Sequence, residues 1–299
     1  SPQGSAPPTA SEPRAMVDAL HHRGPDGQRL HLDGPVGLGH ARLSIIDLEG
    51  GAQPLCNEDE RIWVSFNGEI FNYLELRAEL VAQGHRFRTT SDTEVLVHLY
   101  EQHGDAFVER LNGQFAIALW DGHRRRLLLA RDRVGIRPLF LAQDGPRLAF
   151  ASEVKALFAL PGIARRLSAD GLAATFSYWA PLGSDTVFDG VRQLPPGHVL
   201  SIDAAGRHER RYWDWPFGAA PAARTDDELE EELRALLLDA VRLQLRADVP
   251  VGAYLSGGLD SSIITTLIAR HTDAALRSFS LTFEDAEFDE SAHQQALVD

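Results

Sequence analysis

Residues 249–262 read Val-Pro-Val-Gly-Ala-Tyr-Leu-Ser-Gly-Gly-Leu-Asp-Ser-Ser, an apolar run that passes directly into a loop rich in glycine and serine. A helical pattern follows as far as Arg270, and a second β-branched and aromatic run covers Arg277 to Phe283. Strand, tight loop, helix and strand in this order begin a parallel α/β domain. Residues 225–299 are too few for the five or so strands of an ordinary sheet, so we expect this domain to be incomplete.

The loop has the composition of a polyanion cradle. Its members are Ser256, Gly257, Gly258, Leu259, Asp260, Ser261 and Ser262. Two glycines let the backbone turn with its N–H groups inward, and the hydroxyls and a helix N-terminus add donors and positive potential. Asp260 would repel a bare phosphate, so we expect it to hold a Mg²⁺ ion that neutralises a pyrophosphate. The alternative is a plain glycine turn capped by serine and aspartate. The lysine of a GxxxxGK[ST] loop is missing, which argues against an ordinary phosphate-loop (P-loop) NTPase.

Ahead of this domain, from Gly34 to about Phe150, short alternating or apolar runs are split by two helical stretches, which indicates an α+β layer structure. The predicted strands are Val36–Ile46, Ile62–Phe66, Gln114–Trp120, Arg126–Arg131, Arg137–Leu141 and Arg147–Ala151. The predicted helices are Asn72–Gln83, with Leu76, Leu80 and Val81 on one face, and Thr93–His103. Asp121-Gly122 predicts a hairpin turn with the basic residues 124–126 at a solvated tip. Residues 1–14 are expected to be a flexible terminus or loop.

Between these regions, residues 213–224 read WDWPFGAAPAAR, lose all periodicity and have the composition of a linker. Thr225 then caps a helix, and Glu228 completes a capping box. The apolar face of that helix comprises Leu229, Leu233, Leu236, Leu237 and Ala240. We therefore place one domain at 1–212, a linker at 213–224 and a second domain at 225–299.

Composition excludes several classes of protein. The 299 residues carry 29 Lys plus Arg against 43 Asp plus Glu, and the net charge of −14 argues against a nucleic-acid partner. No apolar run approaches the roughly 20 residues that span a bilayer, and the opening residues lack a secretory signal. We expect a cytoplasmic protein without a membrane partner. The single cysteine, Cys56, allows neither an internal disulfide nor a cysteine-based zinc site, and we expect an ordinary thiol in a loop between strands.

The loop SGGLDSS resembles the pyrophosphate loop of the ATP pyrophosphatases, which cleave ATP to AMP and pyrophosphate while adenylylating a carboxylate. Four further motifs occur, in this order: His22-Arg23-Gly24-Pro25-Asp26-Gly27, Gly39-His40-Ala41-Arg42-Leu43-Ser44-Ile45, Phe66-Asn67-Gly68-Glu69-Ile70-Phe71-Asn72 and Ser91-Asp92-Thr93-Glu94. Together they resemble the glutamine-dependent asparagine synthetases of the bacterial type. The resemblance implies an N-terminal-nucleophile (αββα) glutaminase domain, followed by the beginning of a parallel α/β adenine-nucleotide domain.

Glutamine offers a carboxylate, an ammonium group and a scissile amide. Arg42 can bind the carboxylate bidentately, Asp92 can pair with the ammonium, and Asn67 with the Gly68 N–H can form an oxyanion hole. Glu69 would add a second polar contact. The resemblance also assigns Ile45 and Ile46 to this pocket. Taken singly, Arg42 could be a strand-end surface charge, Asn67-Gly68 a turn and Asp92 a helix N-cap. A stretch from Arg131 to Leu139 resembles the family's segment beneath the pocket, with a structural role.

The family's nucleophile is a cysteine at the mature N-terminus, whose own α-amino group serves as the base. Here position 1 is Ser1, and the PQGSAPP that follows cannot form an apolar strand. Cys56 has no free α-amine. We therefore expect the chain to lack a first strand of about five to eight residues that bears the cysteine, and to be inactive by itself.

The resemblance implies a carbon–nitrogen ligase that uses ATP and Mg²⁺. It would amidate aspartate to asparagine with ammonia from glutamine, release AMP and pyrophosphate, and is compatible with a homodimer. Leu255 and Leu281, the latter on the strand after the loop, match the family's adenine-contacting positions. Two alternatives stay open. One is an amidotransferase of the same family that acts on another carboxylate, of a surface polysaccharide or antibiotic precursor. The other is a non-catalytic glutamine- or nucleotide-binding protein.

Overall fold

The computed structural model describes residues 7–218, 224–273, 275–285, 287 and 289–298. Its contacts fall into two compact units, with the division between Trp215 and Pro216. In the described part of the chain, none of the helices combines the length and apolar character that crossing a bilayer requires.

The centre of the first unit is an antiparallel six-stranded sheet in the order β11-β10-β6-β5-β4-β3. Its strands are β3 Leu55–Cys56, β4 Ile62–Ile70, β5 Gly113–Asp121, β6 Arg126–Arg131, β10 His198–Asp203 and β11 Gly206–Arg211. The longest pairing joins β4 to β5, from Ile62 opposite Asp121 to Ile70 opposite Gly113. Since side chains alternate across a strand, Phe115, Ile117 and Leu119 enter one apolar cluster, whereas Ala116, Ala118 and Trp120 enter another.

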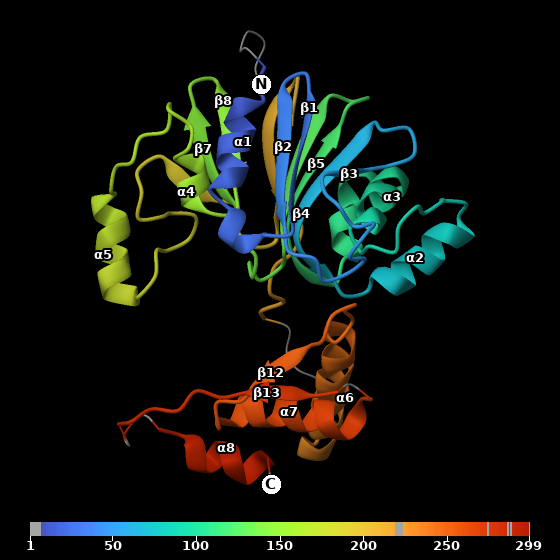
Figure 1. The fold of residues 1–299 in the computed structure, drawn as a ribbon, viewed down its shortest axis with the longest axis vertical. Helices are drawn as coiled ribbons and strands as arrows, with labels where there is room; N and C mark the ends of the chain where they lie inside the picture. Colours follow the sequence, from blue (N-terminus) through green and yellow to red (C-terminus); the bar gives the residue numbers. More distant parts are fainter. Residues whose placement is uncertain (1–6, 219–223, 274, 286, 288, 299) are drawn as a thin grey trace. The chain divides into compact units, whose positions relative to one another are not determined.

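Helices and a second sheet layer cover the two faces of this sheet (Figure 1). On one face lie α2 Tyr73–Ala82, α3 Glu94–His103 and the 3₁₀ segment Gly104–Arg110. On the other lie two smaller sheets, one made of β1 Gly27–Asp33 and β2 Val36–Arg42, the other of β8 Arg147–Ala151, β7 Phe140–Asp144 and β9 Val191–Gln193. Outside these, α1 Ser11–Asp18 and α4 Val154–Leu157 pack on the second layer, and α5 Ala169–Tyr178 follows. The layers are therefore helix, sheet, sheet and helix.

The second unit has the predicted order of elements. It contains α6 Asp226–Gln244, β12 Gly252–Tyr254, α7 Leu259–His271, β13 Arg277–Phe279 and α8 Ser291–Val298. β12 and β13 are parallel. The capping box is confirmed, because the Glu228 N–H donates to Thr225 Oγ1 at 3.3 Å and the Thr225 N–H donates to Glu228 Oε2 at 2.9 Å. The predicted apolar face of α6 is not buried: Leu229, Leu233 and Leu236 are exposed.

The prediction of a flexible terminus was wrong for residues 11–14, which form the start of α1. Pro13 and Val17 are buried. The physical reason lies in β2, whose glycines let the helix approach: a Cβ added at Gly39 would lie 2.5 Å from Val17 Cγ2. Residues 1–6 lie outside the described residues. The scarcity of large apolar side chains in residues 1–14 was therefore a poor guide to flexibility, since small residues on α1 and β2 allow the two elements to pack closely.

Several predicted boundaries were also wrong. β2 ends at Arg42, so residues 43–46 are not strand, and β7 begins at Phe140 rather than Arg137. β4 continues four residues past Phe66 because its pairing with β5 continues. Cys56 is a buried residue of β3, not a loop residue, and Val81 is exposed at 52% although Leu76 and Leu80 are buried. The β5–β6 hairpin is confirmed, but its left-handed residue is Arg125, not Gly122.

A buried carboxylate organises the chain between β6 and β7. Asp132, at 1% exposure, accepts backbone N–H bonds from Phe115 (3.2 Å), Val134 (3.2 Å), Ile136 (2.9 Å) and Arg137 (2.9 Å). Arg131 beside it donates to three backbone carbonyls, those of Gly135, Arg137 and Leu194. These contacts give residues 131–137 a compact turn instead of a strand, and they support the structural role predicted for this stretch.

Asp132→Ala should lower the free energy of unfolding of the first unit by about 3 kcal/mol or more, because several buried N–H groups lose their acceptor at once. Urea unfolding followed by tryptophan fluorescence would measure the loss. Asp18→Ala, at an exposed position at the end of α1, is the control and should change stability by no more than about 0.5 kcal/mol. Equal effects of the two substitutions would contradict the assigned role of Asp132.

Candidate functional site

A cavity of about 1040 Å³ lies in the first unit between the two sheet layers. β2 and β8 line it, β4 and β5 contribute the side chains of the central sheet, and α1 adds Pro13, Met16 and Val17. Among the described residues β2 pairs with β1 and β8 pairs with β7, so each presents its other edge to this space. The cavity is therefore a long slot bordered by two strand edges.

One end of the slot gathers all the residues predicted to bind glutamine. They are Arg42, Ile45, Ile46, Asn67, Gly68, Glu69 and Asp92. They come from the end of β2, the following loop, the end of β4 and the start of α3. Three separate sequence motifs thus converge on one polar pocket.

Arg42 closes this end and shapes the loop beside it. Its guanidinium donates to the carbonyls of Ile46 (3.1 Å), Asp47 (2.5 Å) and Leu48 (3.1 Å). Gly51 is needed here, because an added Cβ would lie 2.5 Å from Arg42 Nη2. Burial lowers the pKa of Arg42, while Asp47, Asp26 and Asp92 act in the opposite direction. Three of the five guanidinium N–H groups thus hold the loop, and two are left for a ligand.

Asn67 and Gly68 lie in strand β4, so the alternative of a turn was wrong. Asn67 Nδ2 donates to Ser152 Oγ at 3.4 Å, immediately after β8. Gly68 has a φ of +148°, and an added Cβ would lie 1.8 Å from the carbonyl oxygen of Gln114. Only glycine fits this position. The next residue, Glu69, is half-buried, and burial raises its pKa while Arg137 opposes the shift.

Asp92 is almost completely buried, at 5% exposure, between β4 and α3. Its Oδ2 accepts the Ile70 N–H at 3.0 Å, so it joins the end of β4 to the start of the helix. It is not the N-cap of α3, which is Thr93. Burial raises the pKa of Asp92 to about 6, Glu69 acts in the same direction, and the Ile70 N–H opposes the shift. A cationic ligand would stabilise the ionised form.

Three pocket residues were not predicted. His40 lines the cavity with Nδ1 at 3.3 Å from Ser65 Oγ, and burial together with Arg42 lowers its pKa to about 4, so it is neutral. Gln53 joins β4 to α3, since its Oε1 accepts the Phe66 N–H and its Nε2 donates to Thr93 Oγ1. Ser152 is the third. His40 stood in a recognised motif, whereas Gln53 and Ser152 have no local signal because their partners are distant in sequence.

The first motif, residues 22–27, supports the pocket from outside. Asp26 Oδ2 accepts the Ser44 N–H at 2.7 Å, which positions the loop that carries Ile45. Glu153, directly after Ser152, binds His22 Nε2 at 3.0 Å and Arg23 at 3.1 Å. The motif therefore connects the loop after β2 to the end of β8.

In the second unit, the glycine–serine loop turns sharply between β12 and α7. Gly257 has a φ of +92°. The Ser256 N–H donates to Ser261 Oγ at 3.2 Å, and Ser261 Oγ donates to the Gly258 carbonyl at 3.2 Å. The N-cap of α7 is Gly258, which has no side chain that could accept a hydrogen bond. The backbone N–H groups of the first turn therefore point out of the helix without a side-chain acceptor at the N-cap. Asp260 is exposed on this first turn.

The predicted adenine-contacting residues have different environments. Leu255 is buried at the end of the apolar run, but Leu281 is 72% exposed and lies two residues past β13, so its placement on the strand was wrong. Gln294 of α8, which the sequence did not indicate, donates to the carbonyls of both Ser256 (3.1 Å) and Leu281 (3.0 Å). It brings the loop and Leu281 together.

A helix–sheet–sheet–helix unit with this pocket at the end of a strand-bordered slot is the fold of the N-terminal-nucleophile glutaminases. The chain belongs to the glutamine amidotransferase family: the family model described as a glutamine amidotransferase domain matches residues 4–213. A second model, described as asparagine synthase, matches residues 232–299. The predicted fold class, a glutaminase domain followed by the start of a synthetase domain, is confirmed.

Curated relatives agree with both matches. "Asparagine synthetase [glutamine-hydrolyzing] 3" of Bacillus subtilis is 40% identical over 290 residues, which are 93% of this chain and 47% of the relative. "Asparagine synthetase [glutamine-hydrolyzing] 2" of the same organism is 39% identical over 291 residues, 92% of this chain and 39% of the relative. "Amidase chry2" of Gibberella zeae is 39% identical over 272 residues, 89% of this chain and 40% of the relative. The chain thus spans about half, or less, of these relatives.

Solved structures support the fold. The glutamine phosphoribosylpyrophosphate amidotransferase of B. subtilis, complexed with ADP and GMP, matches with a TM-score of 0.50 at 19% identity, over 95% of this chain and 68% of that one. An allosteric regulatory enzyme of purine biosynthesis matches with a TM-score of 0.50 at 20% identity, over 89% of this chain and 62% of that one. At this identity the likeness concerns the fold alone.

Proposed function

We propose that the first unit hydrolyses glutamine and that the second begins an ATP-dependent synthetase domain. The whole protein would then be a carbon–nitrogen ligase that amidates aspartate to asparagine and releases AMP and pyrophosphate. The observation that carries the proposal is the convergence of Arg42, Asn67, Gly68 and Asp92 on one pocket. Relatives named as glutamine-hydrolysing asparagine synthetases support it.

In this pocket each group of glutamine has a chemically matched partner. The two remaining N–H groups of Arg42 bind the α-carboxylate, and the buried Asp92 pairs with the α-ammonium. Asn67 Nδ2 and the Gly68 N–H stabilise the oxyanion that forms on the amide carbon during hydrolysis. Glu69, Ile45 and Ile46 border the ligand. Ser152 orients Asn67 through their 3.4 Å contact, and thus fixes the oxyanion donor before the reaction starts.

The slot indicates how a nucleophile would reach these groups. β2 ends at Arg42 and β8 ends beside Ser152, so both strands run toward the polar end. Pro8, among the first described residues, lies at the opposite end, since a Cβ added at Gly37 would lie 3.5 Å from its Cγ. A strand that precedes Ser1 would enter there, pair antiparallel with both edges, and deliver its first residue to Asn67. β2 spans seven residues, within the length of about five to eight expected for this strand.

The second unit would bind the polyphosphate of ATP. The hydroxyls of Ser256, Ser261 and Ser262 and the first N–H groups of α7 suit an anion, and the turn at Gly257 lets the backbone approach it. The exposed carboxylate of Asp260 at this turn fits a Mg²⁺ ligand, and the ion would supply neutralising charge to the pyrophosphate. Leu255 and Leu281 would flank the adenine. We expect the enzyme to work in the cytoplasm without nucleic acid or membrane partners, and a homodimer stays a prediction.

A second candidate keeps the chemistry and changes the acceptor. Two fungal relatives of similar identity, 39% and 37%, are named as amidases rather than asparagine synthetases. In this alternative the carboxylate that receives ammonia belongs to a surface-polysaccharide or antibiotic precursor. Product analysis with aspartate as the only acceptor separates the two: asparagine formation supports the first candidate, and ATP cleavage that needs another carboxylate supports the second.

The glutaminase proposal predicts different effects for two pocket residues, in a form of the protein extended at the N-terminus by a strand that begins with cysteine. Asn67→Ala should lower the kcat of glutamine hydrolysis roughly a hundredfold or more with a smaller change in KM, because an oxyanion donor acts in the transition state. Arg42→Ala should chiefly raise KM. Ammonia release measures both. In the full-length protein, synthesis with added ammonia should survive in both variants, and its loss would contradict this division.

The same assay tests the strand. The chain Ser1–Asp299 should release no ammonia, because its one cysteine, Cys56, is not among the described residues that line the slot. Ammonia release by that chain, abolished by Ser1→Ala, would overturn the proposal that a preceding strand carries the nucleophile.

Glutamine affinity should depend on pH through Asp92. Because burial raises the pKa of Asp92 to about 6, the carboxylate that pairs with the ammonium is present above this pH and lost below it. Kd for glutamine should therefore rise about tenfold from pH 7 to pH 5 and stay nearly constant between about pH 7 and pH 8, where the α-ammonium of glutamine keeps its proton. Calorimetric titration of the chain would measure it. Asp92→Asn should bind weakly with no such pH dependence, and a flat profile in the unsubstituted protein would exclude this pairing.

In a full-length protein, Asp260→Ala should abolish synthesis and the cleavage of ATP to AMP and pyrophosphate, because the metal ligand at the polyphosphate is lost. Glutamine hydrolysis should persist, which serves as the internal control for folding of the first unit. ATP labelled in the α- and γ-phosphates identifies the products. The appearance of ADP and phosphate instead would rule out acyl-adenylate chemistry.

A further inference from the structure

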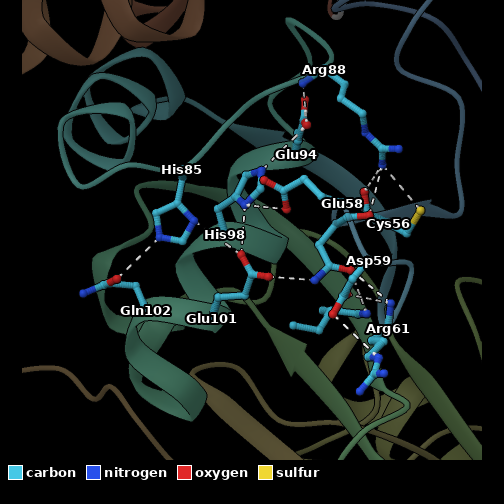
Figure 2. A network of polar contacts seen from close by, with 12 residues as sticks. Cys56, Glu58, Asp59, Arg61, His85, Arg88, Glu94, His98, Glu101 and Gln102 are labelled. Atoms are coloured by element: carbon cyan, nitrogen blue, oxygen red, sulfur yellow. Dashed lines mark hydrogen bonds and ion pairs between the residues drawn. The ribbon is translucent and has the colours of Figure 1, made fainter.

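A second cluster of titratable side chains lies in the first unit, and none of its members lines the glutamine pocket (Figure 2). His98 and Glu101 project from α3, His85 comes from the segment after α2, and Glu58 comes from the turn after β3. Three segments distant in sequence thus meet around one point. The proposed glutaminase chemistry uses none of these groups.

The ligand atoms are close enough to share one ion. Glu101 Oε2 lies 3.0 Å from His98 Nδ1 and 3.4 Å from His85 Nδ1, and one atom from each of the three residues lies within 4.8 Å of the others. Tetrahedral zinc with bonds of about 2.0–2.2 Å places neighbouring ligand atoms about 3.3–3.6 Å apart. Glu58 Oε2, at 3.9 Å from His98 Nδ1, is within reach as a fourth ligand.

Neighbouring groups hold these ligands in position. On the other side of the completely buried His98 ring, Nε2 faces Glu94 Oε1 at 3.7 Å. Glu94 is itself fixed by the backbone N–H groups of Arg88 (2.8 Å) and Thr89 (2.7 Å). Asn57 Nδ2 donates to Glu101 Oε1 at 2.7 Å, which turns Oε2 toward the histidines. A carboxylate behind a ligating histidine and an oriented carboxylate ligand are the usual supports of a zinc site.

We propose that His85, His98 and Glu101, with Glu58 as a fourth ligand, bind one divalent transition-metal ion of the zinc type. Two imidazole nitrogens and carboxylate oxygens suit zinc, cobalt or nickel better than magnesium or calcium. The ion would join α3 to the segment after α2 and to the turn after β3, and so stabilise the helix whose start carries Asp92. Cys56 is not one of the proposed ligands, because its Sγ faces the guanidinium of Arg88 at 3.5 Å.

Without the ion, a proton satisfies the same cluster. Burial lowers the pKa of His98, but Glu101 and Glu94 on its own helix and Glu58 from the neighbouring turn outweigh it and raise the pKa to about 9. His85, from the segment after α2, faces the same Glu101 carboxylate. A metal ion needs the neutral imidazole, so it must displace this proton.

Calorimetric titration of the chelator-treated chain with Zn²⁺ tests the proposal, and we expect one ion per chain. His98→Ala removes a fully buried side chain and could unfold the protein, so His85→Ala and Glu101→Gln are the informative variants. Each should weaken zinc binding at least tenfold and should remove the rise in melting temperature that zinc gives the unsubstituted chain. Co²⁺ in the same site should show the intense visible absorption of four-coordinate cobalt.

His103→Ala, at the end of the same helix, is the matched control and should bind zinc with unchanged affinity. Stoichiometric binding that both His85→Ala and Glu101→Gln weaken, together with the cobalt absorption, would establish the site. Absence of saturable binding, or binding that neither variant changes, would overturn it and leave a protonated His98 that holds three carboxylates.

Discussion

Strand β5 must be buried on both faces, and the first unit is arranged around this requirement. Phe115, Ile117 and Leu119 need a layer of helices, while Ala116, Ala118 and Trp120 need a second sheet, so two layers must cover the central one. The long pairing with β4 then fixes β4 in register and holds Gly68 against the Gln114 carbonyl. The proposed oxyanion donors, Asn67 and Gly68, therefore owe their position to the core and not to a loop.

The sequence predicted the residues of the pocket much better than the local structure around them. Motifs revealed Arg42, Asn67 and Asp92 because the chemistry of glutamine limits the residue types that can serve it. The dipeptide Asn67-Gly68 is compatible with either a turn or a strand, and the pairing of β4 with β5 determines that it is strand. Ser152 could not be found, since its contact with Asn67 joins residues 85 positions apart.

In the second unit, by contrast, the decisive structure is local. The hydrogen bonds within the glycine–serine loop join residues no more than five positions apart, so its turn and the start of α7 follow from the sequence, whereas the bond from Gln294 to the Ser256 carbonyl comes from a residue 38 positions away. The spacing of Leu229, Leu233 and Leu236 correctly predicted a helix, but these side chains are exposed and not buried. A pattern of this kind predicts where a helix is amphipathic, whereas the packing partner depends on other parts of a fold. Leu281 was misplaced for the same reason: the contact that holds it comes from Gln294 of α8.

Three acidic groups, one directly before α3 and two within it, have environments that give them different pKa values. Asp92, just before the helix, is buried beside Glu69, and burial raises its pKa to about 6. Glu94, two residues later, accepts the N–H groups of Arg88 and Thr89 and faces His98, and these contacts overcome burial and lower its pKa to about 2. Glu101, one turn further on from His98, also has a lowered pKa. A buried carboxylate gains from a cationic ligand, which is the role we propose for the α-ammonium of glutamine at Asp92. The carboxylates around His98 face imidazole nitrogens instead, and the proposed metal ion would compete with a proton for those nitrogens.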